Sequence, residues 1–155
     1  MLVQQATAAR AALLDRWEPL LCADAAFGPV LDEALLDVGE FRPRQVVALL
    51  RPHTPDQIRA IVTATAEFGA AVPLYPFSTG RNWGMGSAVP VTDGCTVLDL
   101  SGVRRIRTLD LEAGYAVVET GVTQRQLAKA LAAPPRLLTT TASCACTSAL
   151  GHAAR

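Results

Sequence analysis

Hydrophobic residues recur every three or four positions in the first part of the chain and predict an amphipathic helix between Gln4 and Ala26. The positions expected to face inward are Ala11, Leu14, Trp17, Leu20 and Leu21. Gly28-Pro29 breaks this pattern, and Arg42-Pro43 disfavours helix again. We therefore expect an N-terminal helical segment over residues 1–40 and a second domain over residues 41–155.

The next segment predicts a strand, a helix and a second strand. Residues 45–50 form a mostly apolar run that is typical of a buried strand. Thr54-Pro55-Asp56-Gln57 predicts a helix start, with Thr54 as N-cap, Pro55 at the first helical position and Gln57 completing a capping box. The expected apolar face of this helix consists of Ile58, Ile61, Val62, Thr65 and Phe68. Residues 72–74 then return as a strand.

Shorter elements follow. Residues 96–100 predict a third strand, and residues 105–111 and 115–119 predict a hairpin turned by Glu112-Ala113-Gly114. Thr123 is a second N-cap, for a helix over residues 124–132 that we expect to turn three side chains inward: Leu127, Ala130 and Leu131. The predicted fold class is α+β, with strand-helix-strand units and a mixed sheet preceded by an N-terminal helix.

A glycine-rich loop, residues 75–87, follows the second strand of the strand-helix-strand unit. Its three glycines allow the backbone to approach a ligand closely, and its hydroxyls add hydrogen-bond donors, which is what a dinucleotide pyrophosphate requires. The spacing Gly80-x-x-x-Gly84-x-Gly86 is not that of a Rossmann fingerprint. The loop also lacks the Gly-Lys-Ser or Gly-Lys-Thr ending of nucleoside-triphosphate loops.

Composition excludes several partners. The chain has 155 residues, half of them apolar, and 14 basic against 14 acidic residues, so nothing favours nucleic acid or an anionic membrane. Asp15, Arg16 and Glu18 interrupt the N-terminal apolar pattern, which predicts a cytoplasmic protein without a membrane span. Free thiols are the expected state of the four cysteines, whose spacing predicts no metal site: Cys22, Cys95, Cys144 and Cys146.

Four segments, in this order, resemble the FAD-binding domain of the vanillyl-alcohol oxidase and para-cresol methylhydroxylase family. They are the strand with the helix start 54–58, the loop 76–87, the strand 96–100 and the segment 115–123. The resemblance implies FAD as cofactor and an oxidoreductase that moves a hydride from an organic substrate to the flavin. Within the family, the loop is most similar to that of the branch that oxidises 4-alkylphenols.

The resemblance also implies which residues contact FAD. The pyrophosphate loop would contribute Pro76, Ser78, Thr79, Gly80, Arg81, Asn82, Trp83, Gly84, Met85, Gly86 and Ser87. Further contacts would come from Gly121, Val122, Thr147, Ser148 and Gly151. His152 stands where the family has Asn, which is a departure from the pattern of this last segment.

No residue is assigned a catalytic role, because the family builds its substrate pocket from a later cap domain. The alternatives are therefore a truncated fragment, or an interaction module that needs a second chain to supply the cap. A flavin subunit of the molybdenum-hydroxylase type ranks lowest. Single residues also stay open: His53 is a loop residue or a catalyst, Glu119 an interior polar group or a flavin contact, and Trp83 a packing or stacking residue.

Overall fold

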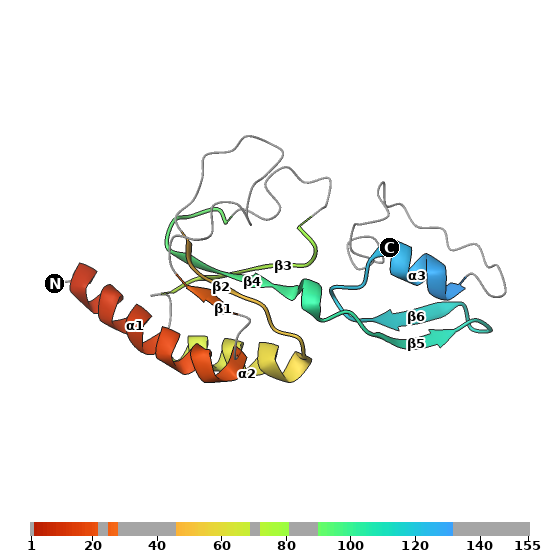
Figure 1. The fold of residues 1–155 in the computed structure, drawn as a ribbon, viewed down its shortest axis with the longest axis horizontal. Coiled ribbons are helices and arrows are strands. Elements are labelled where there is room, and N and C mark those ends of the chain that lie inside the picture. Colours follow the sequence, from red (N-terminus) through yellow and green to blue (C-terminus); the bar gives the residue numbers. More distant parts are fainter. Residues whose placement is uncertain (1, 22–24, 28–45, 69–71, 81–89, 132–155) are drawn as a thin grey trace.

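The computed structural model describes residues 2–21, 25–27, 46–68, 72–80 and 90–131, within which there are three α-helices and six strands in two sheets (Figure 1). In chain order the elements are α1 (Leu2–Leu21), β1 (Ala25–Phe27), β2 (Val46–Leu50), α2 (Pro55–Ala66), β3 (Leu74–Phe77), β4 (Cys95–Asp99), the 3-10 helix η2 (Leu100–Gly102), β5 (Ile106–Asp110), β6 (Tyr115–Val118) and α3 (Gln124–Leu131). This mixed content confirms the predicted α+β class.

The first sheet has the strand order β1-β2-β4-β3. Strands β2, β4 and β3 are parallel, and β1 adds an antiparallel edge by pairing with β2. The last of the parallel strands in sequence, β4, therefore lies between the first two. Val97 of β4 is opposite Leu49 on one side and Tyr75 on the other.

Both N-terminal helices cover the same face of this sheet (Figure 1). Leu13 and Trp17 of α1, Ile61 and Ala64 of α2, and Leu98 of β4 are buried in one apolar cluster. Successive strand residues point to opposite faces, so Leu49 and Val97 form a separate buried pair on the other side. Alternation along the strands thus gives the sheet two apolar faces.

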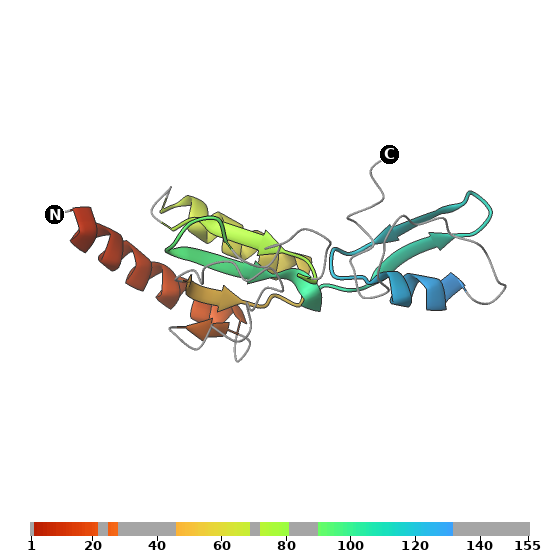
Figure 2. The ribbon, with the colours of Figure 1, turned by 90° about the horizontal axis from the view of Figure 1, so that it is seen from above.

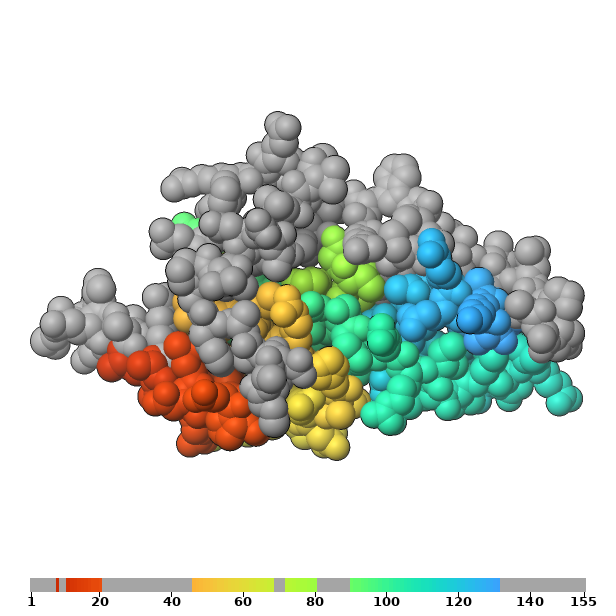
Figure 3. All heavy atoms as spheres, in the orientation of Figure 1, coloured from red at the N-terminus to blue at the C-terminus, as the bar shows by residue number. Residues whose placement is uncertain are grey.

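The second sheet is the antiparallel hairpin β5–β6, which packs against α3. Val122, Leu127 and Leu131 form its buried cluster. This unit lies beside the parallel sheet rather than on top of it, as two perpendicular views show (Figure 1 and Figure 2). In the space-filling view, α1 lies at one end of the described surface, the hairpin with α3 lies at the other, and α2 lies between them (Figure 3).

Local sequence signals correctly predicted where α2 and α3 begin. In α2 the Thr54 hydroxyl accepts from the Gln57 backbone N–H at 3.2 Å, and the Gln57 side chain accepts from the Thr54 N–H at 3.1 Å. In α3 the Thr123 hydroxyl accepts from the Gln126 N–H at 3.2 Å, and the Gln126 side chain accepts from the Thr123 N–H at 2.9 Å. Each pair satisfies helix N–H groups that have no partner within the helix. Both capping predictions are confirmed.

Several predicted positions shift or are wrong. The first helix ends at Leu21 instead of Ala26, because residues 25–27 pair with β2 as strand β1. On α2, Val62 is 48 % exposed and Ala64 is buried in its place, since residue 64 lies on the face that meets α1. Two further predicted inward residues, Ala11 and Ala130, are exposed. The second strand runs over 74–77, so the glycine-rich loop begins at Ser78 and not at residue 75.

The predicted division near residue 40 falls outside the described residues. Two contacts join the parts of the chain before and after this position. Strand β1 pairs with β2, and the Gln57 side-chain amide of α2 donates to the Leu20 carbonyl of α1 at 3.0 Å. The division itself stays a prediction.

Candidate functional site

The parallel strands bring three connecting segments to one edge of the sheet. Leu50 is opposite Leu98, and Phe77 is opposite Asp99, so β2, β4 and β3 end at the same level. The chain therefore leaves this edge at Arg51, Leu100 and Ser78 (Figure 1). In open sheets with parallel strands, ligands bind outside the carboxyl ends of the strands. The described start of the glycine-rich loop is thus in the place where a ligand is expected.

Ser78, Thr79 and Gly80 follow β3 directly, and all three are partly buried. Gly80 has a φ of 66°, in the left-handed region that favours glycine. The Thr79 hydroxyl oxygen is fully buried and has no hydrogen-bond partner among the described residues. An unpaired buried hydroxyl is unfavourable. Trp17 Nε1, Thr96 Oγ1 and Gln124 Nε2 are also buried without a partner among the described residues, so what distinguishes Thr79 is its position at the carboxyl edge of the parallel strands.

The Ser78 hydroxyl has a different environment. It donates to the backbone carbonyl of Thr120, which lies 42 positions further along the chain, next to the hairpin β5–β6. This hydrogen bond joins the end of β3 to the hairpin unit. Sequence spacing gave no signal for it, because the two residues are brought together only by the tertiary fold.

Gly121 lies at the contact between the two units. Its N–H donates to the Val103 carbonyl at 2.7 Å. A Cβ at this position would lie 2.6 Å from the Leu100 carbonyl oxygen, 2.7 Å from that of Ser101 and 2.8 Å from that of Val103. Only glycine fits, because all three neighbouring atoms belong to the backbone. The adjacent Val122 side chain is fully buried in the hairpin core, so it faces packing residues.

A charged pair that the sequence pattern did not predict, Arg51 and Asp99, lies at the same edge. Arg51 Nε lies 3.5 Å from Asp99 Oδ2, while Asp99 Oδ1 accepts from the Ser101 N–H at 2.9 Å and caps η2. The segment Asp99-Leu100-Ser101-Gly102 carries the signal, since Asp commonly accepts from the backbone two residues ahead in a turn. Next to it, a Cβ on Gly102 would be 2.7 Å from Nδ1 of His53, so His53 packs against this turn.

Glu119 is an interior polar group held by hydrogen bonds. Its carboxylate accepts from the Arg105 N–H at 2.7 Å and from Arg107 Nε at 2.8 Å, with a second Arg107 nitrogen at 2.7 Å. Burial alone would raise the pKa of Glu119, but the Arg105 N–H and the Arg107 guanidinium stabilise the charged form, and the pKa falls below its usual value. Its described contacts account for its burial without a ligand.

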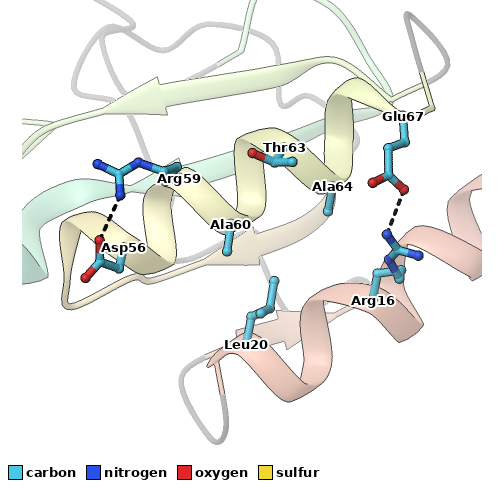
Figure 4. A pocket seen from close by; sticks show the side chains of 8 residues that line it. All are labelled: Arg16, Leu20, Asp56, Arg59, Ala60, Thr63, Ala64 and Glu67. Atoms are coloured by element: carbon cyan, nitrogen blue, oxygen red, sulfur yellow. Dashed lines mark hydrogen bonds and ion pairs between the residues drawn. The ribbon is translucent and has the colours of Figure 1, made fainter.

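A separate cavity of about 400 Å³ lies between α1 and α2 (Figure 4). Leu20, Ala60 and Ala64 are among its lining residues. The ion pairs Arg16–Glu67, at 2.7 Å, and Asp56–Arg59, at 3.1 Å, also belong to it. Exposed pairs of this kind stabilise a protein only slightly. None of the residues predicted to contact a cofactor lines this cavity.

Among the residues whose structure is described, no group of three His, Cys, Asp or Glu side chains is placed to hold a metal ion. Cys95 is a buried free thiol. No helix within the same ranges has the length and hydropathy needed to cross a membrane.

Comparison with protein families gives a match over residues 46–155 to the family described as FAD binding domain. The matched region contains the parallel strands, the loop after β3 and the hairpin. This chain belongs to that family. FAD is therefore the cofactor of this domain, as the loop and its neighbouring segments predicted.

Individual relatives agree with the family assignment. The domain is 39 % identical over 121 residues to 1'-carboxy-chondrochloren decarboxylase of Chondromyces crocatus, covering 71 % of this chain and 22 % of that protein. It is 42 % identical over 74 residues to the flavoprotein subunit of 4-cresol dehydrogenase (hydroxylating) of Pseudomonas putida, and this match covers 48 % of this chain and 14 % of that protein. The FAD-binding domain thus spans less than a quarter of the length of these two relatives.

Solved structures share the fold. The match to p-cresol methylhydroxylase with substrate bound covers 82 % of this chain and 25 % of that chain, with a TM-score of 0.73 and 26 % identity. The match to the 4-ethylphenol oxidase of Gulosibacter chungangensis, in its isoeugenol complex, covers 92 % of this chain and 28 % of that chain, with a TM-score of 0.79 and 23 % identity. These matches confirm the predicted resemblance to the vanillyl-alcohol oxidase and para-cresol methylhydroxylase family.

The described residues of the FAD-binding domain fit its cofactor. The buried Thr79 hydroxyl without a partner and the left-handed Gly80 backbone lie at the carboxyl edge of the parallel strands, where hydrogen-bond donors would meet the anionic pyrophosphate. Pro76 is an exposed residue within edge strand β3, where the missing proline N–H is tolerated. The remaining predicted contacts lie outside the described residues: Arg81, Asn82, Trp83, Gly84, Met85, Gly86, Ser87, Thr147, Ser148 and Gly151.

Proposed function

We propose that this domain binds the FAD of a flavin-dependent oxidoreductase, with the cofactor pyrophosphate at the carboxyl edge of β2, β4 and β3. The observation that carries this proposal is the Thr79 hydroxyl, which is buried without a partner at the start of the loop. The family match over residues 46–155 supports it independently.

The protein residues have separate roles in this proposal. Thr79 and Gly80 are the described part of the pyrophosphate cradle, and the predicted loop residues 81–87 complete it. Gly121 and Val122 form the opposite side, with any contact at Val122 coming from its backbone because its side chain is buried. FAD itself supplies the capacity to accept a hydride.

The proposed substrate class is 4-alkylphenols. Three relatives or neighbours are named for such compounds: 4-cresol dehydrogenase, p-cresol methylhydroxylase and 4-ethylphenol oxidase. Because the domain spans less than a third of each, the substrate pocket is assigned to protein outside these 155 residues. The proposed partner is a second chain that carries a cap domain, and the proposed location is the cytoplasm.

The test is a flavin titration of the purified 155-residue chain, with circular dichroism to establish folding. We expect FAD to remain with the folded protein through gel filtration and to give a flavin absorption band in the protein peak. Folded protein that elutes without flavin at saturating FAD would refute the proposal. An exposed-site variant, Thr108→Val on the hairpin, serves as a control that should bind FAD as the unchanged chain does.

A further inference from the structure

Two adjacent hydroxyl groups at the start of the loop have opposite environments. The Ser78 hydroxyl donates a hydrogen bond to the Thr120 carbonyl. Thr79 Oγ1 is buried and has no partner among the residues that the structure describes. The family resemblance implied a cofactor contact for both residues, whereas their contacts in the structure differ.

We infer that Thr79 is the hydroxyl that donates to the cofactor pyrophosphate, and that Ser78 is a positioning residue that holds the two sides of the site together. This inference rests on the proposed function and adds a division of roles to it. A serine hydroxyl has one proton to donate, so the bond to Thr120 leaves Ser78 no proton for a phosphate oxygen. Thr79 retains its proton, and an anionic oxygen is the strongest available acceptor for it.

The position of the Ser78 bond explains why it affects cofactor binding from a distance. Thr120 directly precedes Gly121, whose backbone packs against the carbonyls of η2. The Ser78 hydroxyl therefore fixes the end of β3 relative to Gly121-Val122. A cofactor held between these segments is bound more tightly when their relative position is already set, because less ordering remains to be done on binding.

The two roles predict opposite effects on the protein without cofactor. In Thr79→Val the side-chain shape is kept and an unpaired buried hydroxyl is removed, so the urea midpoint of the cofactor-free chain should stay equal or rise. In Ser78→Ala the Thr120 carbonyl loses its donor, so the midpoint should fall. Thr79→Ser restores a hydroxyl at position 79 and serves as the conservative variant.

The effects on cofactor affinity separate the roles further. We expect Thr79→Val to weaken FAD binding by about 10- to 100-fold, the loss typical of one hydrogen bond to a charged group, and Thr79→Ser to recover most of it. ADP, which contains the diphosphate but no flavin, should show the same dependence on residue 79. Ser78→Ala should also weaken FAD binding, because the two segments that hold the cofactor are no longer positioned relative to each other before it binds.

Isothermal calorimetry with FAD and with ADP, together with urea unfolding of all four proteins, tests the inference. Thr79→Val that binds both ligands unchanged would overturn the assignment of Thr79, and Ser78→Ala with an unchanged midpoint would overturn that of Ser78. Absence of FAD binding by the unchanged chain would refute the proposed function and the role of Thr79, whereas the unfolding data would still decide the role of Ser78.

Discussion

Replacing Gly121 by alanine tests the packing between the two units most directly. The added Cβ would lie 2.6 to 2.8 Å from three backbone carbonyl oxygens, and Cβ atoms in proteins essentially never lie within 3.0 Å of heavy atoms from residues outside their immediate chain neighbours. The Val103 carbonyl cannot move away freely, because it accepts the Gly121 N–H at 2.7 Å. Gly121→Ala must therefore displace backbone, weaken this hydrogen bond, or both.

The expected cost is the sum of two contributions. Overpacking typically costs about 1–3 kcal/mol, and the weakened hydrogen bond adds about 1 kcal/mol, for a total of about 2–4 kcal/mol. With a urea dependence of about 2 kcal/mol per molar, the unfolding midpoint should fall by about 1–2 M. Urea denaturation followed by circular dichroism measures this shift.

Gly114→Ala is the matched control. Gly114 has a φ of 74° in the hairpin turn, and a Cβ there would meet no atom within 4 Å. Its cost is the backbone strain of a left-handed alanine alone, about 1 kcal/mol. A Gly121→Ala midpoint equal to or above that of Gly114→Ala would refute the packing of Gly121 against η2.

Two further predictions concern buried groups. Glu119→Gln should lower the free energy of unfolding by about 1–3 kcal/mol at neutral pH, since the carboxylate accepts from Arg105 and Arg107. Because the folded pKa of Glu119 is lowered, this contribution is complete above the unfolded pKa, about 4.3, and is lost as the pH falls through the folded value. Urea unfolding from pH 7 to about pH 3 should show the difference between the two proteins shrinking on the acid side, and a constant difference would contradict the ionic role. On α2, Ile61→Ala should lower the free energy of unfolding by about 2–5 kcal/mol, because Ile61 is fully buried. Val62→Ala should change it by no more than about 0.5 kcal/mol, because Val62 is 48 % exposed. Equal thermal stability of these two variants would contradict the orientation of the helix.

Local sequence signals predicted the helix starts and most strands of this domain. Thr54 with Gln57 and Thr123 with Gln126 specify their caps within four residues, so no tertiary information is needed. Helix faces were less predictable. Val62 is hydrophobic and adjoins the apolar stripe, yet the packing of α1 against α2 buries Ala64 instead.

The carboxyl edge of the parallel strands was also only partly predictable. The composition of the glycine-rich loop predicted a dinucleotide cofactor for the domain, because glycine and hydroxyl residues suit a pyrophosphate. The different environments of the Ser78 and Thr79 hydroxyls were not predictable, since the Thr120 carbonyl reaches Ser78 only when the hairpin unit packs beside the parallel sheet. The Arg51–Asp99 pair likewise depends on the register of β2 against β4.

The strand order of the parallel sheet has a consequence for folding. β4 lies between β2 and β3 but follows both in the chain, so neither has its parallel partner until residues 95–99 have left the ribosome. During that interval, two apolar strands expose backbone groups that other chains can pair with. We therefore expect nascent chains that end before β4 to depend on chaperones, and the sheet to form late, in one step, around its central strand.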